Sequence, residues 1–471
     1  MIEQALDDGH SPRAILLTTK GGNTDLGDEG YELAVSSEAI VIRALEPAGV
    51  FFAIQTLRQL LGHPASHHQH AAQADWYIPG LMIEDKPRFR WRGLHLDVAR
   101  HMFSVEAIKC YIDLLALHKM NTFHWHLTDD QGWRIEIKEF PKLTTIGSKR
   151  TATPIPSNRD QSDGNPYEGF YTQEQVKEIV THAASRYVNV VPEIELPGHA
   201  LSALASYPHL GCSGGPYQVG TSWGVFEDVF CAGNENVYEF LEQVLSQIME
   251  LFPNEYIHIG GDECPKTRWN DCPKCQAVIT KYGLKDEHEL QSFFIKRIAA
   301  FLSSKGRRMI GWDEILEGGL APDTTVMVWR DSTYGAESAQ LGHDVIMCPT
   351  DYCYFDYYQS EDRDAEPPAI GGYLPLEKVY SFEPLPDTIS PEQVVHFLGG
   401  QGNVWTEYIS SPEQVEYMAF PRATALAEVL WSPHESRDYG DFTERLSTFL
   451  GHLKRACINY RDPFRERSAP G

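Results

Sequence analysis

The sequence lacks long hydrophobic segments. Its 471 residues contain no apolar run of about 18 residues or more, the length that a membrane-spanning helix needs. The stretch from Met1 to Lys20 also has no charged start followed by an apolar core, as a signal peptide would. As written, the chain is therefore predicted to be soluble and cytoplasmic. Secretion stays open if the N-terminus is truncated.

The cysteines do not form the pattern of a disulfide framework. There are nine, an odd number scattered over a large chain. Cys272 and Cys275 have the local spacing of zinc ligands and follow Cys264, but no second Cys-x-x-Cys or histidine pair comes after them at a suitable distance. We therefore expect no metal and no cofactor. A disulfide between Cys212 and Cys231 in an exported protein stays open.

Basic residues are scarce relative to acidic ones. The 40 lysines and arginines against 66 aspartates and glutamates give a formal charge of −26, which would repel nucleic acid or an anionic membrane. A neutral or cationic substrate fits this charge better, and a homodimer is compatible with it. The ten tryptophans suit a sugar-binding cleft, although burial in a core is the commoner role of any single one.

The length predicts either two or three domains or one barrel with an appendage. Residues 30–61 contain two alternating strand-like stretches, a glycine turn and an amphipathic helix, which predict a small α+β unit. Residues 63–73 are polar and rich in histidine, and we interpret them as a connector in preference to a metal-binding tract. We place the domain boundary at Asp85-Lys86-Pro87, which gives domains 1–86 and 87–471.

After the boundary, the pattern strand, loop, helix repeats along the chain. Ser104 is predicted to cap a first helix, Thr172 with Gln175 to form a capping box on a second, and Pro412 to Val429 to form the last helix. Each strand-like segment ends in a polar or aromatic cluster, which predicts a (β/α)8 barrel. The eight segments are 92–98, 121–127, 188–195, 256–259, 308–314, 324–330, 344–348 and 397–404.

The adjacent acids Asp262 and Glu263 occupy the most informative of these strand ends. Tyr256 to Ile259 is a short apolar strand, and Gly260-Gly261 allows the backbone to turn sharply before the two acids. An arbitrary Asp-Glu pair is more often a solvated loop. Here the acids follow a strand of the predicted barrel, at the end where such barrels keep their catalytic residues.

Five segments of the sequence resemble the signature motifs of glycoside hydrolase family 20, the β-N-acetylhexosaminidases. They occur in the family's order, the resemblance spans residues about 88 to 433, and residues 30–61 resemble the later part of the small domain that precedes the family's barrel. That domain usually begins well before the first residue here, so a short or truncated sheet is one expectation for this domain. The segments are RWRGLHLDVARH, NTFHWHLTDDQGWR, VVPEIELPGHA, HIGGDECPKTRW and GQGNVWTEY.

The resemblance implies an exo-acting hydrolase that removes terminal β-linked N-acetylglucosamine or N-acetylgalactosamine. The mechanism would be retaining and substrate-assisted, with the sugar's own 2-acetamido oxygen as nucleophile. Glu263 would then be the general acid and base. Asp262 would hold the acetamido nitrogen and stabilise the oxazolinium ion, and Tyr354 would bind the acetamido oxygen. A general acid works best when its pKa is raised toward the working pH, so we expect a raised pKa for Glu263.

The resemblance also implies which residues bind the sugar. Arg100 would grip the 3- and 4-hydroxyls, unless it forms a surface ion pair. Asp129 and His199 would tune the acid, and strand register favours Asp129 over the aspartate after it. The remaining sugar contacts would be three tryptophans around the ring and two carboxylates at the 4- and 6-hydroxyls: Trp312, Trp329, Trp405, Asp356 and Glu407. Burial in a structural core is the alternative for the tryptophans.

Two other functions compete with this interpretation. A metal-dependent barrel hydrolase could use His124, His126, His199 and Asp129, because His124 and His126 share one strand face. A sugar-binding barrel without catalysis is the alternative outside enzymology. The presence of both acids of the Asp-Glu pair argues against it.

Overall fold

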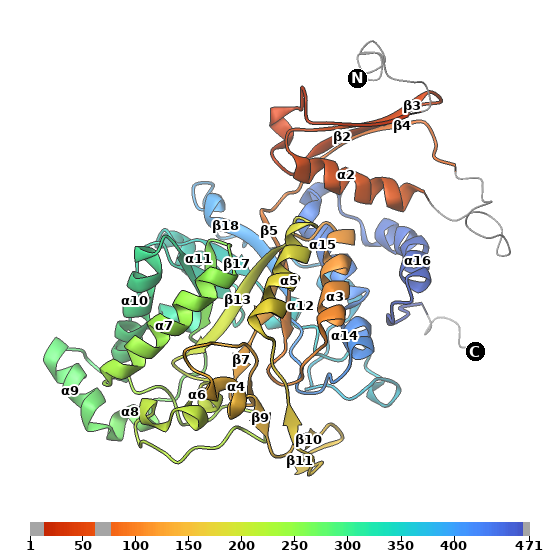
Figure 1. Cartoon of the computed structure of the whole chain (residues 1–471). Coiled ribbons are helices and arrows are strands. Elements are labelled where there is room, and N and C mark those ends of the chain that lie inside the picture. The colour runs from red at the N-terminus through yellow and green to blue at the C-terminus, as the bar shows by residue number, and fades with distance from the viewer. Residues whose placement is uncertain (1–13, 62–76, 465–471) are drawn as a thin grey trace.

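The computed structural model describes residues 14–61 and 77–464, which form a small α+β domain and a closed parallel barrel (Figure 1). The histidine-rich stretch 63–73, interpreted above as a connector, lies outside the described residues. None of the helices in the described part is long and apolar enough to cross a membrane.

The small domain is a four-stranded sheet with one helix against it. Its strand order is β1-β3-β2-β4, and β3 pairs parallel with β1 and antiparallel with β2. The helix α2 buries Phe52 and Leu57 against the sheet, and Pro47 begins it where no backbone N–H is needed. The two strands and the helix predicted in residues 30–61 are confirmed. The bounds are β1 Ala14–Thr18, β2 Tyr31–Val35, β3 Ala39–Ala44, α2 Pro47–Leu60 and β4 Leu81–Asp85.

The small domain is joined to the barrel by polar contacts. The guanidinium of Arg92, at the start of the barrel, pairs with Glu29 at 2.8 Å, and the indole of Trp431 donates to Asp85 at 2.8 Å. Figure 1 shows α2 between the sheet and the barrel. The domain thus sits at the end of the barrel where the strands begin.

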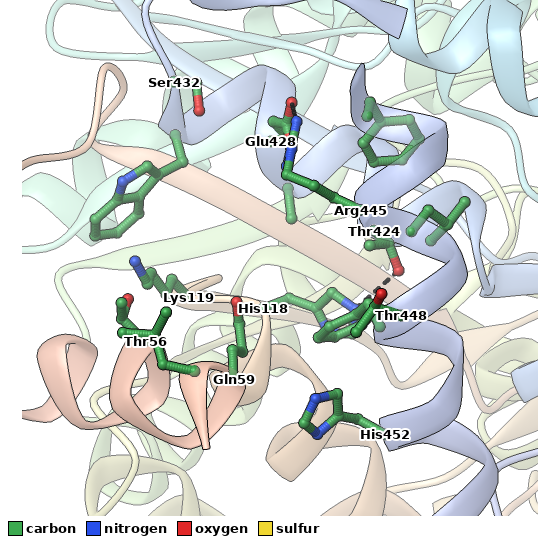
Figure 2. Close-up of a pocket in the computed structure, with 16 residues that line it drawn as sticks. Thr56, Gln59, His118, Lys119, Thr424, Glu428, Ser432, Arg445, Thr448 and His452 are labelled. Atoms are coloured by element: carbon green, nitrogen blue, oxygen red, sulfur yellow. Dashed lines mark hydrogen bonds and ion pairs between the residues drawn. The ribbon is translucent and has the colours of Figure 1, made fainter. Parts of the chain in front are cut away.

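A cavity of about 440 Å³ lies at this junction (Figure 2). His118 Nε2 lies 2.9 Å from the hydroxyl of Thr424 there, and burial lowers the pKa of His118 to about 4. Among the described residues that line the cavity, Glu428 is the single carboxylate, and Arg445 pairs with it at 2.7 Å. Among its described lining residues, this cavity therefore has no second carboxylate that could act together with Glu428.

The barrel closes through eight parallel strands in the order β13-β14-β15-β16-β17-β18-β5-β6. All eight predicted segments are confirmed as its strands. Their bounds are β5 Trp91–Asp97, β6 Thr122–His126, β13 Asn189–Leu196, β14 Tyr256–Gly260, β15 Arg308–Trp312, β16 Thr325–Val328, β17 Val345–Met347 and β18 Phe397–Gly402.

Helices cover the outside of the barrel between most strands. Ser104 accepts from the Ala107 amide to cap α3, and Thr172 forms the predicted capping box on α5. Between β15 and β16 the chain forms a 3₁₀ turn in place of a helix. The covering helices are α3 Val105–Leu117, α5 Gln173–Ala184, α7 Glu235–Leu251, α10 Glu287–Ser304, α11 Thr333–Gln340, α13 Leu376–Tyr380, α14 Pro412–Ala419, α15 Arg422–Trp431 and α16 Tyr439–Arg455.

The last predicted helix, Pro412 to Val429, is wrong as a single element. The structure has two helices, α14 and α15, separated at Phe420 and Pro421. A proline inside a helix lacks the amide donor and its ring clashes with the preceding turn, so the chain ends one helix and begins another. The apolar pattern continues through the break because both helices pack against the barrel.

The loops after the strands carry several short elements. Figure 1 shows β7, α6 and α8 at the end of the barrel opposite the small domain, after the carboxyl ends of β6, β13 and β14. This end is where α/β barrels bind their ligands. The short elements are β7 Thr128–Asp129, β8 Gly132–Trp133, α4 Lys142–Thr145, β9 Lys149–Arg150, β10 Pro154–Ile155, β11 Asn158–Ser162, β12 Tyr167–Glu168, α6 Leu201–Ser206, α8 Thr267–Asp271, α9 Pro273–Tyr282 and α12 Thr350–Cys353.

Candidate active site

The turn after β14 places the Asp-Glu pair. Gly260 and Gly261 have φ angles of 68° and 92°, in the left-handed region that glycine tolerates. A Cβ on Gly260 would lie 1.7 Å from a carboxylate oxygen of Glu195, so any other residue there would have to displace the buried Glu195 side chain. Glu263 itself has a φ of 41°, a strained backbone for a residue with a side chain. The sharp turn predicted from the sequence is present.

A cavity of about 230 Å³ opens at the carboxyl ends of the strands. The structure brings all eleven candidate residues from the sequence into its lining: Arg100, Asp129, His199, Asp262, Glu263, Trp312, Trp329, Tyr354, Asp356, Trp405 and Glu407. Sequence reasoning missed four other lining residues, which are Glu195, Thr350, Tyr357 and Ile370. Glu195 carried a usable signal, because it lies two residues after Glu193 on the same face of β13.

The two adjacent acids lie in different environments. The side chain of Asp262 is 12% exposed, whereas that of Glu263 is 43% exposed at the mouth of the cavity. Burial raises the pKa of Asp262 to about 7, and the charge of Glu263 adds to this against the opposing effect of His199. The hydrogen bond with His199 lowers the pKa of Glu263, although partial burial opposes it. The raised pKa expected for Glu263 is therefore wrong for the ligand-free cavity.

His199 connects this pair to two further carboxylates. Its Nδ1 atom lies 3.2 Å from Asp129 and 3.1 Å from Asp130, and its Nε2 atom lies 3.5 Å from Glu263 and 3.8 Å from Asp262. Burial opposes a charge on the imidazole, but the charge of Asp129 and the hydrogen bonds with Asp129, Asp130 and Glu263 outweigh burial and raise the pKa of His199 well above its ordinary value. His199 is therefore a cation between four acids. The sequence presented Asp129 and Asp130 as alternatives, but both contact it.

Arg100 is buried in the cavity wall and is not a surface residue. It is 6% exposed, and its guanidinium donates to Gln131 at 2.8 Å and pairs with Asp129 at 2.8 Å and Asp97 at 3.2 Å. A weaker contact of 3.6 Å reaches Glu407. These contacts fix the Arg100 guanidinium in one orientation, and its partners Asp129 and Glu407 also line the cavity.

Aromatic side chains make up part of the cavity lining. Trp312 donates to Glu193 at 2.8 Å, and Trp329 donates to Glu314 at 2.9 Å. The ring of Trp329 stacks on Tyr354 with centroids 6.2 Å apart, while Trp312 and Trp405 lie 5.9 Å apart. The indole N–H groups of Trp312 and Trp329 thus have partners, and these rings present flat apolar faces to a ligand.

Several carboxyl oxygens in the cavity lining have no hydrogen-bond partner within the described part of the chain. They are one oxygen of Asp262, one of Asp356 and both of Glu195. Buried acceptors without partners are unfavourable, so this lining is suited to a ligand that brings several N–H and O–H donors. Burial, with the charge of Glu407 second, raises the pKa of Asp356 well above its ordinary value.

Below the cavity, Glu193 holds a buried polar network in the barrel interior. Its carboxylate contacts His258 at 2.8 Å and His124 at 3.2 Å, and it also bonds His126. His124 and His126 therefore belong to the barrel core and do not line the cavity with His199. The four residues proposed above as ligands of a metal-dependent hydrolase, His124, His126, His199 and Asp129, do not come together as one group of possible ligands in the described residues.

Comparisons with known proteins agree with this architecture. The family model for the glycosyl hydrolase family 20 catalytic domain matches residues 89–434, and the model for domain 2 of that family matches residues 2–86. A β-hexosaminidase of Porphyromonas gingivalis is 47% identical over 444 residues, which are 94% of this chain and 56% of that protein. This chain thus spans little more than half the length of that relative.

Solved structures of β-N-acetylhexosaminidases are also similar to this chain. An exo-β-N-acetylglucosaminidase from Vibrio harveyi in complex with N-acetylglucosamine has a TM-score of 0.82 at 36% identity, covering 96% of this chain and 70% of its own. A mutant β-hexosaminidase of Streptomyces plicatus in complex with its product N-acetylglucosamine has a TM-score of 0.82 at 34% identity, covering 95% and 85%. With its barrel and small domain both matched, this chain belongs to glycoside hydrolase family 20.

Proposed function

We propose that this protein is an exo-acting β-N-acetylhexosaminidase. It would hydrolyse terminal, non-reducing β-linked N-acetylglucosamine or N-acetylgalactosamine with retention of configuration, through an oxazolinium intermediate. The observation that carries the proposal is the adjacent pair Asp262 and Glu263, one acid buried with an unpartnered oxygen and the other exposed at the mouth. That arrangement suits two acids that act on different atoms of one sugar.

A two-carboxylate mechanism fits the geometry less well. It needs a nucleophile and an acid about 5 to 5.5 Å apart on opposite sides of the anomeric carbon, and neighbours in sequence do not face each other in this way. Glu195 and Glu314 are the other nearby candidates for a nucleophile. Burial raises the pKa of Glu195 well above its ordinary value and that of Glu314 to about 8, which disfavours the carboxylate form that a nucleophile needs. The acetamido oxygen of the substrate remains as nucleophile.

The exposure of the two acids decides their roles. The leaving group lies toward solvent, so Glu263 at the mouth would protonate the departing oxygen and later activate water. Asp262 faces inward, where it would accept the acetamido N–H and stabilise the positive charge of the oxazolinium ion. Tyr354, stacked on Trp329, lies on the same inner side to donate to the acetamido oxygen.

In the ligand-free cavity the proton resides on the wrong acid for this chemistry. The pKa of Asp262 is raised to about 7 and that of Glu263 is lowered. An acetamido N–H donated to Asp262 favours its ionised form, and an aglycone that covers Glu263 removes water from it and favours its protonated form. Binding of the substrate itself would therefore set the required protonation states.

Sugar hydroxyls match the remaining lining. The guanidinium of Arg100 would donate to the 3- and 4-hydroxyls, while Asp356 and Glu407 would accept from the 4- and 6-hydroxyls. A volume of about 230 Å³ is below the usual 300 to 1,000 Å³ of drug-sized sites and suits a single ring. This size supports the removal of one terminal residue at a time.

A panel of p-nitrophenyl glycosides tests the proposal directly. Rapid hydrolysis of the β-N-acetylglucosaminide or the β-N-acetylgalactosaminide, with only trace hydrolysis of the β-glucoside and the α-N-acetylglucosaminide, is the expected pattern. Proton NMR of the first product formed should show the β anomer. Binding of N-acetylglucosamine without hydrolysis of any member would favour the sugar-binding barrel, and comparable hydrolysis of the glucoside would remove the acetamido group from the mechanism.

A further inference from the structure

Four cysteines from distant parts of the chain meet at the outer edge of the barrel. The sulfurs of Cys212, Cys231, Cys272 and Cys275 all lie within 4.8 Å of one another. The separation is 3.9 Å between Cys212 and Cys275, and 3.7 Å from Cys231 to each of Cys272 and Cys275. Three of the four are buried, and Cys212 is partly buried.

These separations match a tetrahedron of thiolates around one ion. A Zn–S bond of about 2.3 Å places the four sulfurs of a tetrahedral site about 3.8 Å apart. A disulfide would bring two sulfurs to about 2.05 Å, and each of the nine cysteines is free in this structure. An iron–sulfur cluster is larger than one ion and would hold its cysteine sulfurs further apart than they are here.

The backbone around the cluster brings the sulfurs together without help from an ion. Gly211 and Phe230 form an antiparallel bridge, and the amide of Cys231 donates to Leu210 at 2.9 Å, which joins the two ends of the loop 211–231. The indole of Trp269 on α8 donates to Phe230 at 2.9 Å and ties this loop to the helices.

Close packing of two backbones completes the framework. A Cβ on Gly233 would lie 2.2 Å from the carbonyl carbon of Lys274, so only glycine allows residue 233 to approach the Cys-x-x-Cys turn. Cys272 precedes α9 and Cys275 lies in its first turn, where free backbone N–H groups and the helix dipole favour thiolates.

We propose that Cys212, Cys231, Cys272 and Cys275 bind one structural Zn²⁺ ion. On binding, each thiol that becomes a ligand loses its proton, and the closed set of four protein ligands leaves no position for a substrate. The sequence could not show this site, because the second pair of ligands precedes the Cys-x-x-Cys motif by 41 residues or more. Cys264, which precedes the motif in the sequence, is not among the four.

The ion would brace a loop that supports the sugar-binding cavity. Within the loop, the carbonyl of Ser222 accepts from Gln131 at 3.0 Å, and Gln131 in turn accepts from Arg100. The amide of Gly220 donates to the carbonyl of Asp130 at 2.8 Å. Loss of zinc should therefore lower the melting temperature of the protein. It should also raise KM more than it lowers kcat, since none of the four zinc-binding cysteines is in contact with Asp262 or Glu263.

Metal and thiol counting on the intact protein tests the site without reference to activity. Protein purified without a metal-affinity column should contain about one zinc ion per chain, as measured by inductively coupled plasma mass spectrometry. Denatured in a chelator without reductant, it should titrate all nine thiols. A count of seven or five thiols would indicate one or two disulfides. Nine thiols without bound metal would mean that the four cysteines hold no ion, and bound iron would mean that the site takes a different metal. Each of these results would overturn the proposal.

Substitutions then locate the ion. Cys275→Ser should lower zinc content at least about tenfold, whereas Cys457→Ser, at an exposed cysteine outside the cluster, should leave it unchanged. Cys212→His offers a variant that keeps a zinc-binding donor, and retained zinc there with loss in Cys212→Ala would assign the ligand even if Cys275→Ser does not fold. Zinc that persists in both Cys212→Ala and Cys275→Ser would place the ion elsewhere.

Because the readout is zinc content, the outcome is independent of the proposed function. A protein with one zinc and no hydrolase activity would uphold the site and refute the proposed function. A hydrolase without zinc would do the reverse. Replacement of the ion by Co²⁺ gives a second signature, since a tetrahedral tetrathiolate site produces visible d–d absorption that the control variant Cys457→Ser should retain.

Discussion

The Nε2 atom of His199 lies 3.5 Å from a carboxylate oxygen of Glu263. Both residues have left-handed backbones, with φ angles of 46° and 41°, so the contact joins two strained positions at the ends of neighbouring strands. The positive imidazole holds the pKa of Glu263 below its ordinary value. His199 therefore decides where the proton of the acid pair resides before a substrate enters.

We expect His199→Asn to move the pH profile of kcat/KM toward higher pH. Removal of the cation takes away the hydrogen bond that lowers the pKa of Glu263 and the charge that opposes the burial-raised pKa of Asp262. Both pKa values then rise, so both limbs of the profile should shift in the same direction. His182→Asn on α5 is the control and should leave the profile unchanged. Limbs that stay in place while activity falls would indicate a purely structural role.

Glu263→Gln should reduce turnover by roughly 10²-fold or more, the usual contribution of a general acid, with little change in substrate binding. The loss should be smaller for phenolate leaving groups of low pKa, which need less protonation. A series of aryl glycosides with different leaving groups measures this dependence. Equal losses across the series would take Glu263 out of the acid role.

Asp262→Asn should lower kcat without producing a covalent glycosyl-enzyme, because in the proposed mechanism the acetamido oxygen and not a carboxylate attacks the anomeric carbon. The neutral amide no longer stabilises the developing positive charge. Incubation of the unsubstituted protein with an activated 2-deoxy-2-fluoro glycoside, followed by intact-mass spectrometry, should show no adduct. A stable ester on Asp262 would assign a different mechanism to the same fold.

Arg100→Lys should lower kcat/KM by roughly 10- to 100-fold, the loss expected for hydrogen bonds to a charged donor at about 1.5 to 3 kcal/mol. An ammonium cannot span two vicinal hydroxyls and also keep the contacts with Gln131 and Asp129. Arg297→Lys on α10 is the matched control. Normal kinetics for Arg100→Lys would place its guanidinium outside the sugar site.

Gly260→Ala should destabilise the protein by roughly 3 kcal/mol or more, since it combines left-handed strain with a clash in a packed site. Gly283→Ala is a close control: its φ of 64° is similar to the 68° of Gly260, but a Cβ there meets nothing within 4 Å. The control should cost only about 1 kcal/mol. Denaturant unfolding of both variants measures the difference, and equal losses would refute the clash with Glu195.

The barrel was predictable because its signals are local. Each strand is a short apolar segment followed by polar or aromatic residues, and parallel strands must bring those ends to one face, so the candidates from Arg100 to Glu407 line one cavity. The direction of the pKa shift on Glu263 was not predictable, because it depends on where the His199 ring lies. The break at Pro421 carried a local signal that the continuous apolar pattern obscured.

The cavity of about 230 Å³ suits one sugar ring, and the buried network of Glu193 with His124, His126 and His258 fills the barrel interior below it. A polymer therefore cannot thread through the proposed enzyme and can present only its terminus. The amount of reaction would scale with the number of chain ends in a sample and not with its mass. A glycan cut into short pieces by another hydrolase should be degraded faster, gram for gram, than the intact chain.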